Sequence, residues 1–407
     1  MPDYGDDDMN LAIIGGGPAG LRAAEVASEG GAKVQLFDAM PSVGRKLLVA
    51  GKGGLNLTKE EPRERMAARY SGEEQPKDVW SSLLHDFDTA ALRAWVHGLG
   101  VETFVGTSNR IFPHEMKAAP FLRHWVHRLH KQNVQFFMRH RWHAIRKGFP
   151  IVLEFLVDKQ IKTVSCDVAI LALGGASWPK TGSTAQWVTI LSELGVKVIP
   201  LKAANCGWEV DWSRQVVSAV EGEPLKNLIV RAGDTTIAGE LLITRYGLEG
   251  GVLYQLGTEL RAMENPELSI DFKMPHTVSA LVGKMGSVHR SCLAMVRQRL
   301  KLSDSAFAVL SHVYGSETWY SSEDLAHKIK NCTIPLVRSR PLDEAISTAG
   351  GICWSELNND LMLTKYPGIF VCGEMIDWEA PTGGYLIHGC LAMGARAAKG
   401  ALAFLQK

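Results

Sequence analysis

The spacing of hydrophobic and polar residues changes several times along the chain, and each change marks a predicted element. Four short apolar runs, at residues 11–14, 33–37, 134–138 and 167–173, are bounded by polar or turn residues. Runs of this length are typical of strands, and an uninterrupted run such as 167–173 is typical of a strand buried on both faces of a parallel sheet. A fifth apolar run at 369–372 predicts one more strand near the C-terminus.

Helices are predicted where apolar residues recur every three or four positions. Two clear examples are residues 86–98 and the segment 385–404, which is rich in small residues. The other helices predicted this way cover residues 118–132, 278–285, 288–300, 304–312 and 322–330. The alternating segments 151–157 and 161–164 predict a hairpin.

A change in the sequence pattern after residue 195 predicts an inserted domain. The chain has 407 residues, which is too long for one compact core. Residues 1–195 and 340–407 carry the parallel-sheet pattern and are expected to form one discontinuous α/β domain. The insert is predicted to have a β-rich part at 196–274 and 331–339 and a helical part at 275–330.

A glycine-rich turn follows the first predicted strand. In Gly15-Gly-Gly-Pro-Ala-Gly20, Gly15 permits the tight turn, Gly17 lets the backbone approach a diphosphate, and Gly20 lets the helix and strand pack closely. The helix that begins here offers free N–H groups and a partial positive charge to the diphosphate. Asp38 closes the next strand, where a carboxylate can accept a hydrogen bond from a ribose hydroxyl. The segment predicts a dinucleotide site, and the alternative is an ordinary strand–turn–helix unit.

The C-terminal segment indicates which dinucleotide is bound. The strand at 369–372 delivers Gly373 and Glu374, and the acidic side chain is suited to ribityl or phosphate-side hydroxyls. Gly383 and Gly384 then open a helix whose first N–H groups would face the flavin N1/C2=O edge, where negative charge collects on reduction. This order favours a flavin, and the alternative is a last strand with a packing helix.

Further motifs, in one order over nearly the whole chain, carry a resemblance to a known family. They are Gly44-Arg-Lys-Leu-Leu48, Gly51-Lys-Gly-Gly-Leu-Asn56, Arg110-Ile-Phe-Pro113, Leu171-Ala-Leu-Gly-Gly-Ala-Ser-Trp-Pro179, Gly239-Glu-Leu-Leu-Ile-Thr244, Thr348-Ala-Gly-Gly351 and Pro381-Thr-Gly-Gly-Tyr385. The chain resembles the NAD(P)/FAD-dependent flavoproteins that include aminoacetone oxidase-like and bile-acid-reductase-like members. The resemblance implies a Rossmann-like FAD-binding α/β fold of the glutathione-reductase type, with a central parallel sheet and an inserted mixed domain.

The chain departs from the pattern of this family in two loops. Gly54-Leu55-Asn56 stands where Arg-Cys-Asn is usual, and Leu248-Glu-Gly-Gly251 stands where Ser-Gly-Pro tends to follow. The resemblance implies that both loops lie near the reacting edge of the flavin. The departures therefore leave the substrate open, whereas the flavin itself is still expected.

The motifs define a set of expected cofactor contacts. Lys46 is expected to neutralise phosphate or anionic reduced flavin, although a surface lysine needs no such role. Asn56 is a candidate for the pyrimidine edge of the ring, although loops favour asparagine in any case. The residues predicted to bind FAD, without a covalent link, are Gly15, Gly17, Ala19, Gly20, Asp38, Lys46, Gly51, Asn56, Gly174, Gly373, Glu374, Gly384 and Tyr385.

Three residues are candidates for substrate contacts. Arg245 and Tyr246 follow an apolar run in the insert and would suit an anionic or polar substrate, but a solvated β-turn explains them equally well. His388 lies one turn into the last helix, where it would serve as an acid or base or would simply pack. No residue declares itself as an obligatory acid, base or nucleophile, so the catalytic residue stays open.

Composition restricts the classes of protein to consider. The net charge is +1, no apolar run reaches the length of a membrane span, and residues 1–8 are acidic, unlike a signal peptide, and are expected to be disordered. The seven cysteines are scattered without a CxxC motif, which favours buried thiols in a reducing, cytoplasmic setting. The histidines are not matched by carboxylates at ligand spacing, so no metal site is expected.

Residues 117–147 are rich in Lys, Arg and His, contain no Asp or Glu, and have aromatic residues interleaved. This pattern suits nucleic acid. The balanced charge of the whole chain favours a lesser role, which is to attract FAD phosphates or an anionic substrate. A small-molecule substrate is therefore expected, with no nucleic-acid partner and no membrane.

The predicted function is that of an FAD-dependent oxidoreductase, which transfers a hydride between a small organic substrate and flavin N5. An amine oxidase-type activity is preferred, and the alternative is a reductase of unsaturated or carbonyl compounds with NAD(P)H as electron donor. A third alternative is an FAD-binding regulatory or RNA-associated protein. Since the sequence has no second GxGxxG motif, NADH alone is expected to reduce the flavin slowly or not at all. The oligomeric state is open.

Overall fold

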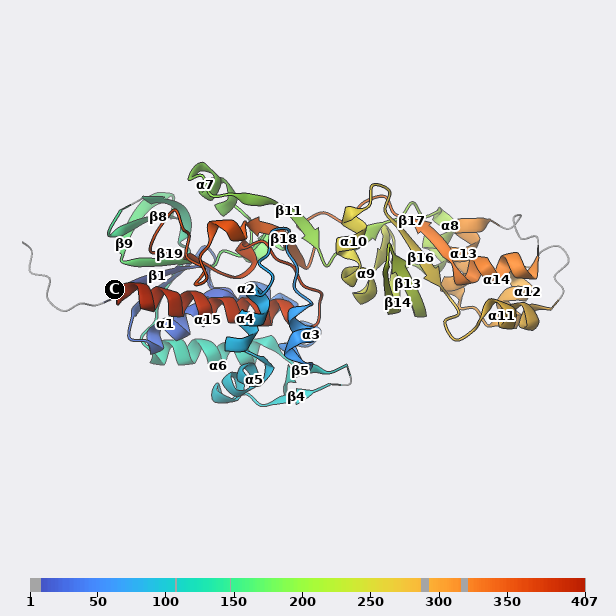
Figure 1. Cartoon of the computed structure of the whole chain (residues 1–407), viewed down its shortest axis with the longest axis horizontal. Coiled ribbons are helices and arrows are strands. Elements are labelled where there is room, and N and C mark those ends of the chain that lie inside the picture. Colours follow the sequence, from blue (N-terminus) through green and yellow to red (C-terminus); the bar gives the residue numbers. More distant parts are fainter. Residues whose placement is uncertain (1–8, 107, 147, 287–292, 316–320, 407) are drawn as a thin grey trace, which may run out of the picture. The chain divides into compact units, whose positions relative to one another are not determined.

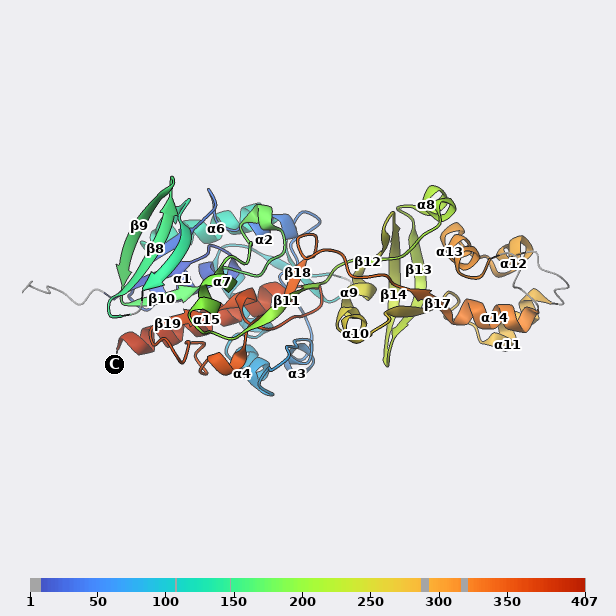
Figure 2. The same cartoon turned by 90° about the horizontal axis from the view of Figure 1, so that it is seen from above.

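The computed structural model describes residues 9–106, 108–146, 148–286, 293–315 and 321–406. The chain forms two compact units, residues 1–202 with 347–407, and residues 203–346 (Figures 1 and 2). The acidic segment 1–8, Cys292 and the start of the helix predicted at 288–300 lie outside the described residues.

A parallel five-stranded sheet forms the centre of the first unit, and all its strand pairs are parallel. Its strands in spatial order are β19 (Ile369–Val371), β10 (Val168–Leu171), β1 (Asn10–Ile14), β2 (Lys33–Asp38) and β6 (Gln135–Met138). All four residues of β10 are buried, as their apolar run predicts. The five predicted strands and the parallel α/β fold are confirmed.

Two long helices pack on each other beside this sheet, α1 (Pro18–Glu29) and α15 (Tyr385–Leu405) (Figure 1). Gly394 permits their close approach, because a Cβ atom there would lie 2.2 Å from the Ala19 carbonyl oxygen. The remaining helices of the unit are α2 (Arg45–Ala50), α3 (Arg63–Ala67), α4 (Val79–Asp86), α5 (Thr89–Gly98), α6 (Ala118–Lys131) and α7 (Trp187–Glu193), with short 3-10 turns at Pro179–Thr181, Trp354–Glu356 and Gly373–Met375.

The described residues of the first unit also form three smaller sheets. They consist of β3 (Thr58–Lys59), β5 (Arg110–Pro113) and β4 (Thr103–Val105); of β7 (Arg141–Arg146), β8 (Ile151–Val157) and β9 (Gln160–Cys166); and of β11 (Val198–Ala204) with β18 (Ser347–Ile352). The hairpin predicted over 151–164 is β8–β9, and its strands pair antiparallel.

The helix predicted at 86–98 is wrong at its start. Asp86 is the last residue of α4, and α5 begins only at Thr89. Phe87 lies outside the helical region with φ −149°, and the Asp88 carboxylate accepts a hydrogen bond of 2.8 Å from the Ala91 N–H. Asp88 is thus the N-cap of α5. This cap separates α4 from α5, whereas the spacing of apolar residues alone predicts that Asp86 belongs to the same helix as Gly98.

An antiparallel six-stranded sheet forms the second unit. Its strands in order are β12 (Trp208–Glu209), β15 (Gly247–Glu249), β14 (Thr235–Thr244), β13 (Pro224–Ala232), β16 (Glu267–Asp271) and β17 (Cys332–Pro335). Its helices are α8 (Arg214–Val220), α9 (Gly251–Gln255), α10 (Gly257–Ala262), α11 (Val278–Met285), α12 (Leu293–Leu300), α13 (Asp304–Tyr314) and α14 (Ser322–Lys330). Strands and helices share one hydrophobic core.

The sequence pattern places the insert at 196–339, whereas the second unit spans 203–346. The difference arises because most of β11 pairs with β18, which is part of the first unit. The Cys353 N–H also donates to the Lys197 carbonyl over 3.0 Å. These contacts join residues far apart in the sequence. The boundary of the inserted unit therefore cannot be predicted from the local pattern of hydrophobic and polar residues.

Candidate flavin site

The turn between β1 and α1 needs its glycines for different reasons. Gly15 has φ +111°, and a Cβ atom there would lie 2.2 Å from the Ala172 carbonyl oxygen. A Cβ at Gly20 would lie 1.9 Å from the Gly15 carbonyl oxygen. At Gly17, by contrast, an added Cβ meets no described atom within 4 Å. Gly15 and Gly20 therefore close the turn, and Gly17 leaves the space that a diphosphate would take.

A cavity opens in front of this turn, where the carboxyl ends of β1, β2, β10 and β19 meet. This edge is where α/β sheets of this kind bind their ligands. Of the predicted FAD-binding residues, the cavity is lined by Gly15, Gly17, Ala19, Asp38, Lys46, Gly174, Gly373 and Glu374. Residues from four separate parts of the sequence are thus brought to one cavity.

Asp38 is held by the backbone of the turn. One carboxylate oxygen accepts from the Gly16 N–H over 2.7 Å and the other from the Met40 N–H over 2.8 Å. Burial raises the pKa of this carboxyl, and the two backbone hydrogen bonds oppose that rise. The carboxylate therefore fixes the turn around the cavity, and its contact with a ribose stays a prediction.

Lys46 and Glu374 form an ion pair in the lining of the cavity. The Lys46 Nζ lies 2.8 Å from a Glu374 carboxylate oxygen and 2.5 Å from the Ser177 hydroxyl. The other Glu374 oxygen accepts from the Thr348 N–H over 2.9 Å. A cation and an anion thus lie side by side in the cavity. The cation suits a phosphate group of a dinucleotide, and the anion suits a hydroxyl group of the same molecule.

The loop at Asn56 meets the first turn of α15. Gly384 has φ +94°, and a Cβ atom there would lie 2.5 Å from the Thr58 backbone nitrogen and 2.9 Å from the Asn56 Oδ1. The Asn56 Oδ1 is buried and has no hydrogen-bond partner among the described residues. A buried acceptor without a donor is costly, so it points to a donor on a ligand. The residues present therefore fit a flavin ring beside the N-terminus of α15.

His388 is buried in the interior of the first unit and is not among the residues that line this cavity. Its Nε2 lies 2.8 Å from the Phe87 carbonyl oxygen, so Nε2 carries the proton and donates. Its Nδ1 then accepts from the Thr58 hydroxyl over 2.7 Å. Burial lowers the pKa of His388 to about 4, and the neutral ring ties α15 to β3. This geometry favours the packing interpretation over contact with a substrate.

Three other residues predicted to bind FAD make contacts within the protein. The Gly174 carbonyl accepts from the Trp187 Nε1 over 2.8 Å, and the Tyr385 hydroxyl donates to Glu61 over 2.6 Å. A Cβ at Gly51 would lie 2.5 Å from the Ala118 Cβ, so Gly51 lets its loop pack on α6. For these three residues, contact with FAD stays a prediction.

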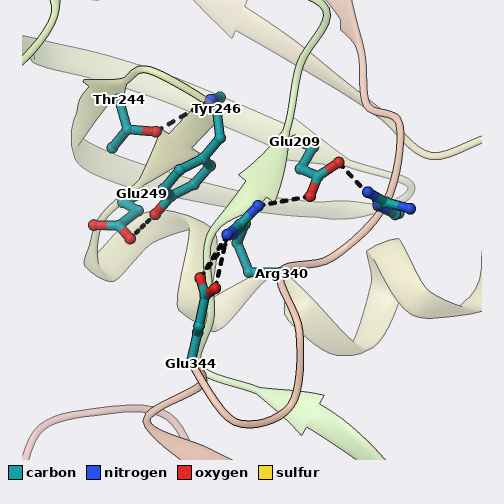
Figure 3. Close-up of polar contacts among 8 residues, drawn as sticks. Glu209, Thr244, Tyr246, Glu249, Arg340 and Glu344 are labelled. Carbon is teal, nitrogen blue, oxygen red and sulfur yellow. Dashed lines mark hydrogen bonds and ion pairs between the residues drawn. The ribbon is translucent and has the colours of Figure 1, made fainter.

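Arg245 and Tyr246 belong to the second unit. Arg245 is exposed and pairs with Glu221 over 3.3 Å. The Tyr246 hydroxyl contacts the Glu249 carboxylate, and the Arg340 guanidinium lies 4.3 Å from the centre of the Tyr246 ring (Figure 3). Arg340 is itself held by Glu209 and Glu344, at 2.7 Å each. Tyr246 is thus part of an ionic network, and its contact with a substrate stays a prediction.

Several residues around the site escaped sequence reasoning. Thr348 and Ser177 bond the Glu374–Lys46 pair, and both stand in motifs that carried only the family resemblance. Cys372 and Cys390 also line the cavity, and burial raises the pKa of the Cys390 thiol to about 12, so both are better regarded as neutral lining than as nucleophiles. Nothing in their local sequence marks them.

The family assignment follows from a comparison with protein-family models. The model described as HI0933-like protein Rossmann domain matches residues 9–400. The chain belongs to this family. The resemblance stated from the motifs is thereby confirmed.

Among characterised relatives, the 3-dehydro-bile acid delta(4,6)-reductase of Clostridium scindens is 26% identical over 421 residues, covering 96% of this chain and 98% of the relative. The ribosomal RNA dihydrouridine synthase of Escherichia coli is 24% identical, covering 93% of this chain and 94% of the relative. These comparisons make the chain one of the FAD-dependent oxidoreductases. They do not support the narrower expectation of an amine oxidase.

Solved structures with the same fold include two flavoenzymes. The 3-ketosteroid delta1-dehydrogenase of Sterolibacterium denitrificans has a TM-score of 0.52 at 11% identity, covering 98% of this chain and 100% of that one. A flavocytochrome c3 fumarate reductase has a TM-score of 0.50 at 13% identity, covering 99% and 80%. At such low identity these likenesses establish the fold alone. Among the described residues, no helix is long and apolar enough to span a membrane.

Proposed function

We propose that this chain reduces a carbon–carbon double bond conjugated with a carbonyl group. The observation that carries the proposal is the shared chemistry of two relatives that align over more than nine-tenths of the chain. One is named for the reduction of ring double bonds in an oxidised bile acid, and the other for making dihydrouridine. Dihydrouridine arises from uridine by saturation of a double bond conjugated with a ring carbonyl. Both substrates are therefore electron-poor alkenes.

The residues of the site support this proposal through the cofactor they would hold. FAD, when bound, supplies the hydride that such a double bond receives, and the second hydrogen arrives as a proton. The open space at Gly17 and the N-terminus of α1 would take the diphosphate. Lys46 and Glu374 would hold the phosphate and ribityl side, and Asn56 the pyrimidine edge. The positive end of α15 would stabilise negative charge on that edge.

The proposal is tested with the FAD-loaded protein, reduced anaerobically with one equivalent of dithionite. Mixing with the enone 4-androstene-3,17-dione or with uridine is expected to restore the absorbance near 450 nm and to give one equivalent of saturated product. In parallel, the oxidised protein is mixed with aminoacetone under nitrogen. If the amine bleaches the flavin and both alkenes leave the reduced form unchanged, the reductase proposal is wrong and the oxidase alternative is correct.

A uracil within RNA is a second candidate substrate, and the outer face of α6 favours it. The inner face of α6 buries Phe121, Trp125 and Leu129, and Arg128 turns to the buried Glu25 at 2.8 Å. Glu29 of neighbouring α1 accepts from Gln132 over 3.1 Å. The exposed outer face carries Arg123, His124, His127, His130 and Lys131. A helix face that carries cations and no acidic residue suits a polyanion.

If RNA is the substrate, reversing the charges on this face of α6 is expected to weaken RNA binding and to change its dependence on salt. Arg123→Glu with Lys131→Glu is expected to weaken binding of a uridine-rich single-stranded RNA and to lower the slope of log Kd against log salt concentration by about 1.4, since each phosphate contact contributes about 0.7. Lys159→Glu with Lys162→Glu, at exposed positions in and beside β9, changes the net charge equally. Equal loss in both double variants would mean that only net charge matters and would remove this candidate.

A further inference from the structure

A groove in the second unit gathers lysines from three separate segments. Its described lining includes Lys226 from β13, Lys273 from the turn after β16, and Lys301 from the junction of α12 and α13. His276 also contributes, and no Asp or Glu is among the described residues that line it. Three cations that converge from distant parts of a chain are not explained by one solvated helix face.

The backbone is shaped to bring these lysines together. The pairing of β13 with β14 is irregular between Leu225 and Leu228, and Asn227 within this irregularity has φ +56°. Such bulges redirect side chains and are common beside functional sites. The bulge places Lys226 on the groove, where it is exposed. Lys301, at the opposite segment, also has a left-handed backbone, with φ +48°.

The charge of the groove is not balanced by Asp271, which lies two residues before Lys273. Asp271 is buried, and its carboxylate pairs with Lys330 over 2.5 Å while it accepts from the Lys273 N–H over 2.8 Å. The Lys273 ammonium itself donates to the Lys301 carbonyl oxygen over 3.0 Å. Partial burial, together with the charge of Lys284, lowers the pKa of Lys273. A partly desolvated ammonium next to like charges is the setting that a bound anion would relieve.

We infer that this groove binds a phosphate group carried by a nucleotide or a polynucleotide. Lysine ammonium groups bind phosphate as compact positive charges, and three of them around one groove match its multiple oxygens. The groove also has apolar walls at Phe272, Pro275 and Leu302, which suit a ring or sugar beside the phosphate. The site lies within the second unit and is independent of the proposed reduction.

Calorimetric titration of the FAD-loaded full chain with inorganic pyrophosphate, in chloride buffer of fixed ionic strength, tests the inference. Lys273→Met is expected to raise the dissociation constant roughly tenfold, as expected for one charge-assisted hydrogen bond. Lys226→Met, at an exposed position of the same groove, is also expected to raise the dissociation constant. The matched control is Lys328→Met, which removes a lysine of the same unit that pairs with Asp324. If Lys328→Met weakens binding as much as the other two, the groove is not a phosphate site.

Competition identifies the source of the phosphate. A uridine-rich RNA that displaces pyrophosphate from the native protein, and does so less well from Lys226→Met, assigns the groove to a polynucleotide backbone. Displacement by NADPH but not by NADH assigns it to the additional phosphate of that dinucleotide. Pyrophosphate binding that none of these three competitors affects would overturn the assignment to a nucleotide phosphate.

Discussion

Replacing Gly17 with valine is expected to abolish FAD binding while leaving the protein folded. An added Cβ at Gly17 meets no described atom within 4 Å, and the residue has φ −80°, which any amino acid tolerates. The branched side chain would therefore occupy only the space expected for the diphosphate. We expect the dissociation constant of FAD to rise by roughly 100-fold or more, which corresponds to about 2.7 kcal/mol.

The measurement is flavin content after purification, followed by titration of the apoprotein with FAD. Gly283→Val is the matched control, because an added Cβ there also meets no described atom within 4 Å but lies on α11 of the second unit. Gly15→Val is less informative, since its side chain would collide with the Ala172 backbone and destabilise the fold itself. A folded Gly17→Val protein with native flavin content would refute the placement of the diphosphate.

The parts of the site that lie within one short segment could be predicted from the sequence. The turn from Gly15 to Gly20 is such a part, because its glycines stand at fixed spacing between one strand and one helix, and Gly20 packs on the Gly15 carbonyl a few residues away. The parallel strands could be predicted equally well, since a strand buried on both faces has an uninterrupted run of apolar residues. Periodicity failed at Asp88, where the side-chain cap of α5 interrupts an apolar pattern that continues from α4.

The side-chain pairs in and around the site could not be predicted in the same way. Lys46 and Glu374 are 328 residues apart, and Thr58 and His388 are 330 apart. Nothing in a local window distinguishes the lysine that meets a glutamate from a lysine in solvent. His388 shows the same limit, because its position one turn into α15 suggested an acid or base, and only its two hydrogen bonds identify it as a buried link. The insert boundary depends on the pairing of β11 with β18 for the same reason.

Acidification is expected to destabilise the protein through His388. The side chain is fully buried, and burial lowers its pKa from 6.5 to about 4 in the folded protein. Between these values the unfolded chain binds a proton that the folded protein excludes, so unfolding is favoured as the pH falls. The contribution is absent above pH 6.5 and is complete near pH 4, where it amounts to about 3 kcal/mol.

Urea unfolding of the apoprotein at pH 7.0, 6.0, 5.0 and 4.5 measures this dependence, with His388→Gln as the comparison. Glutamine keeps a donor near the Phe87 carbonyl but does not titrate, so the variant is expected to be less stable at pH 7 and to lose less stability on acidification. The difference between the two proteins in the free energy of unfolding should therefore shrink as the pH falls. Because His388 bonds Thr58, and Gly384 packs on the Thr58 backbone, the same acidification should also weaken FAD retention in the native protein more than in the variant. Parallel pH profiles for the two proteins would mean that the pKa of His388 is the same in the folded and unfolded states. The link between α15 and β3 would then not be the source of the acid sensitivity.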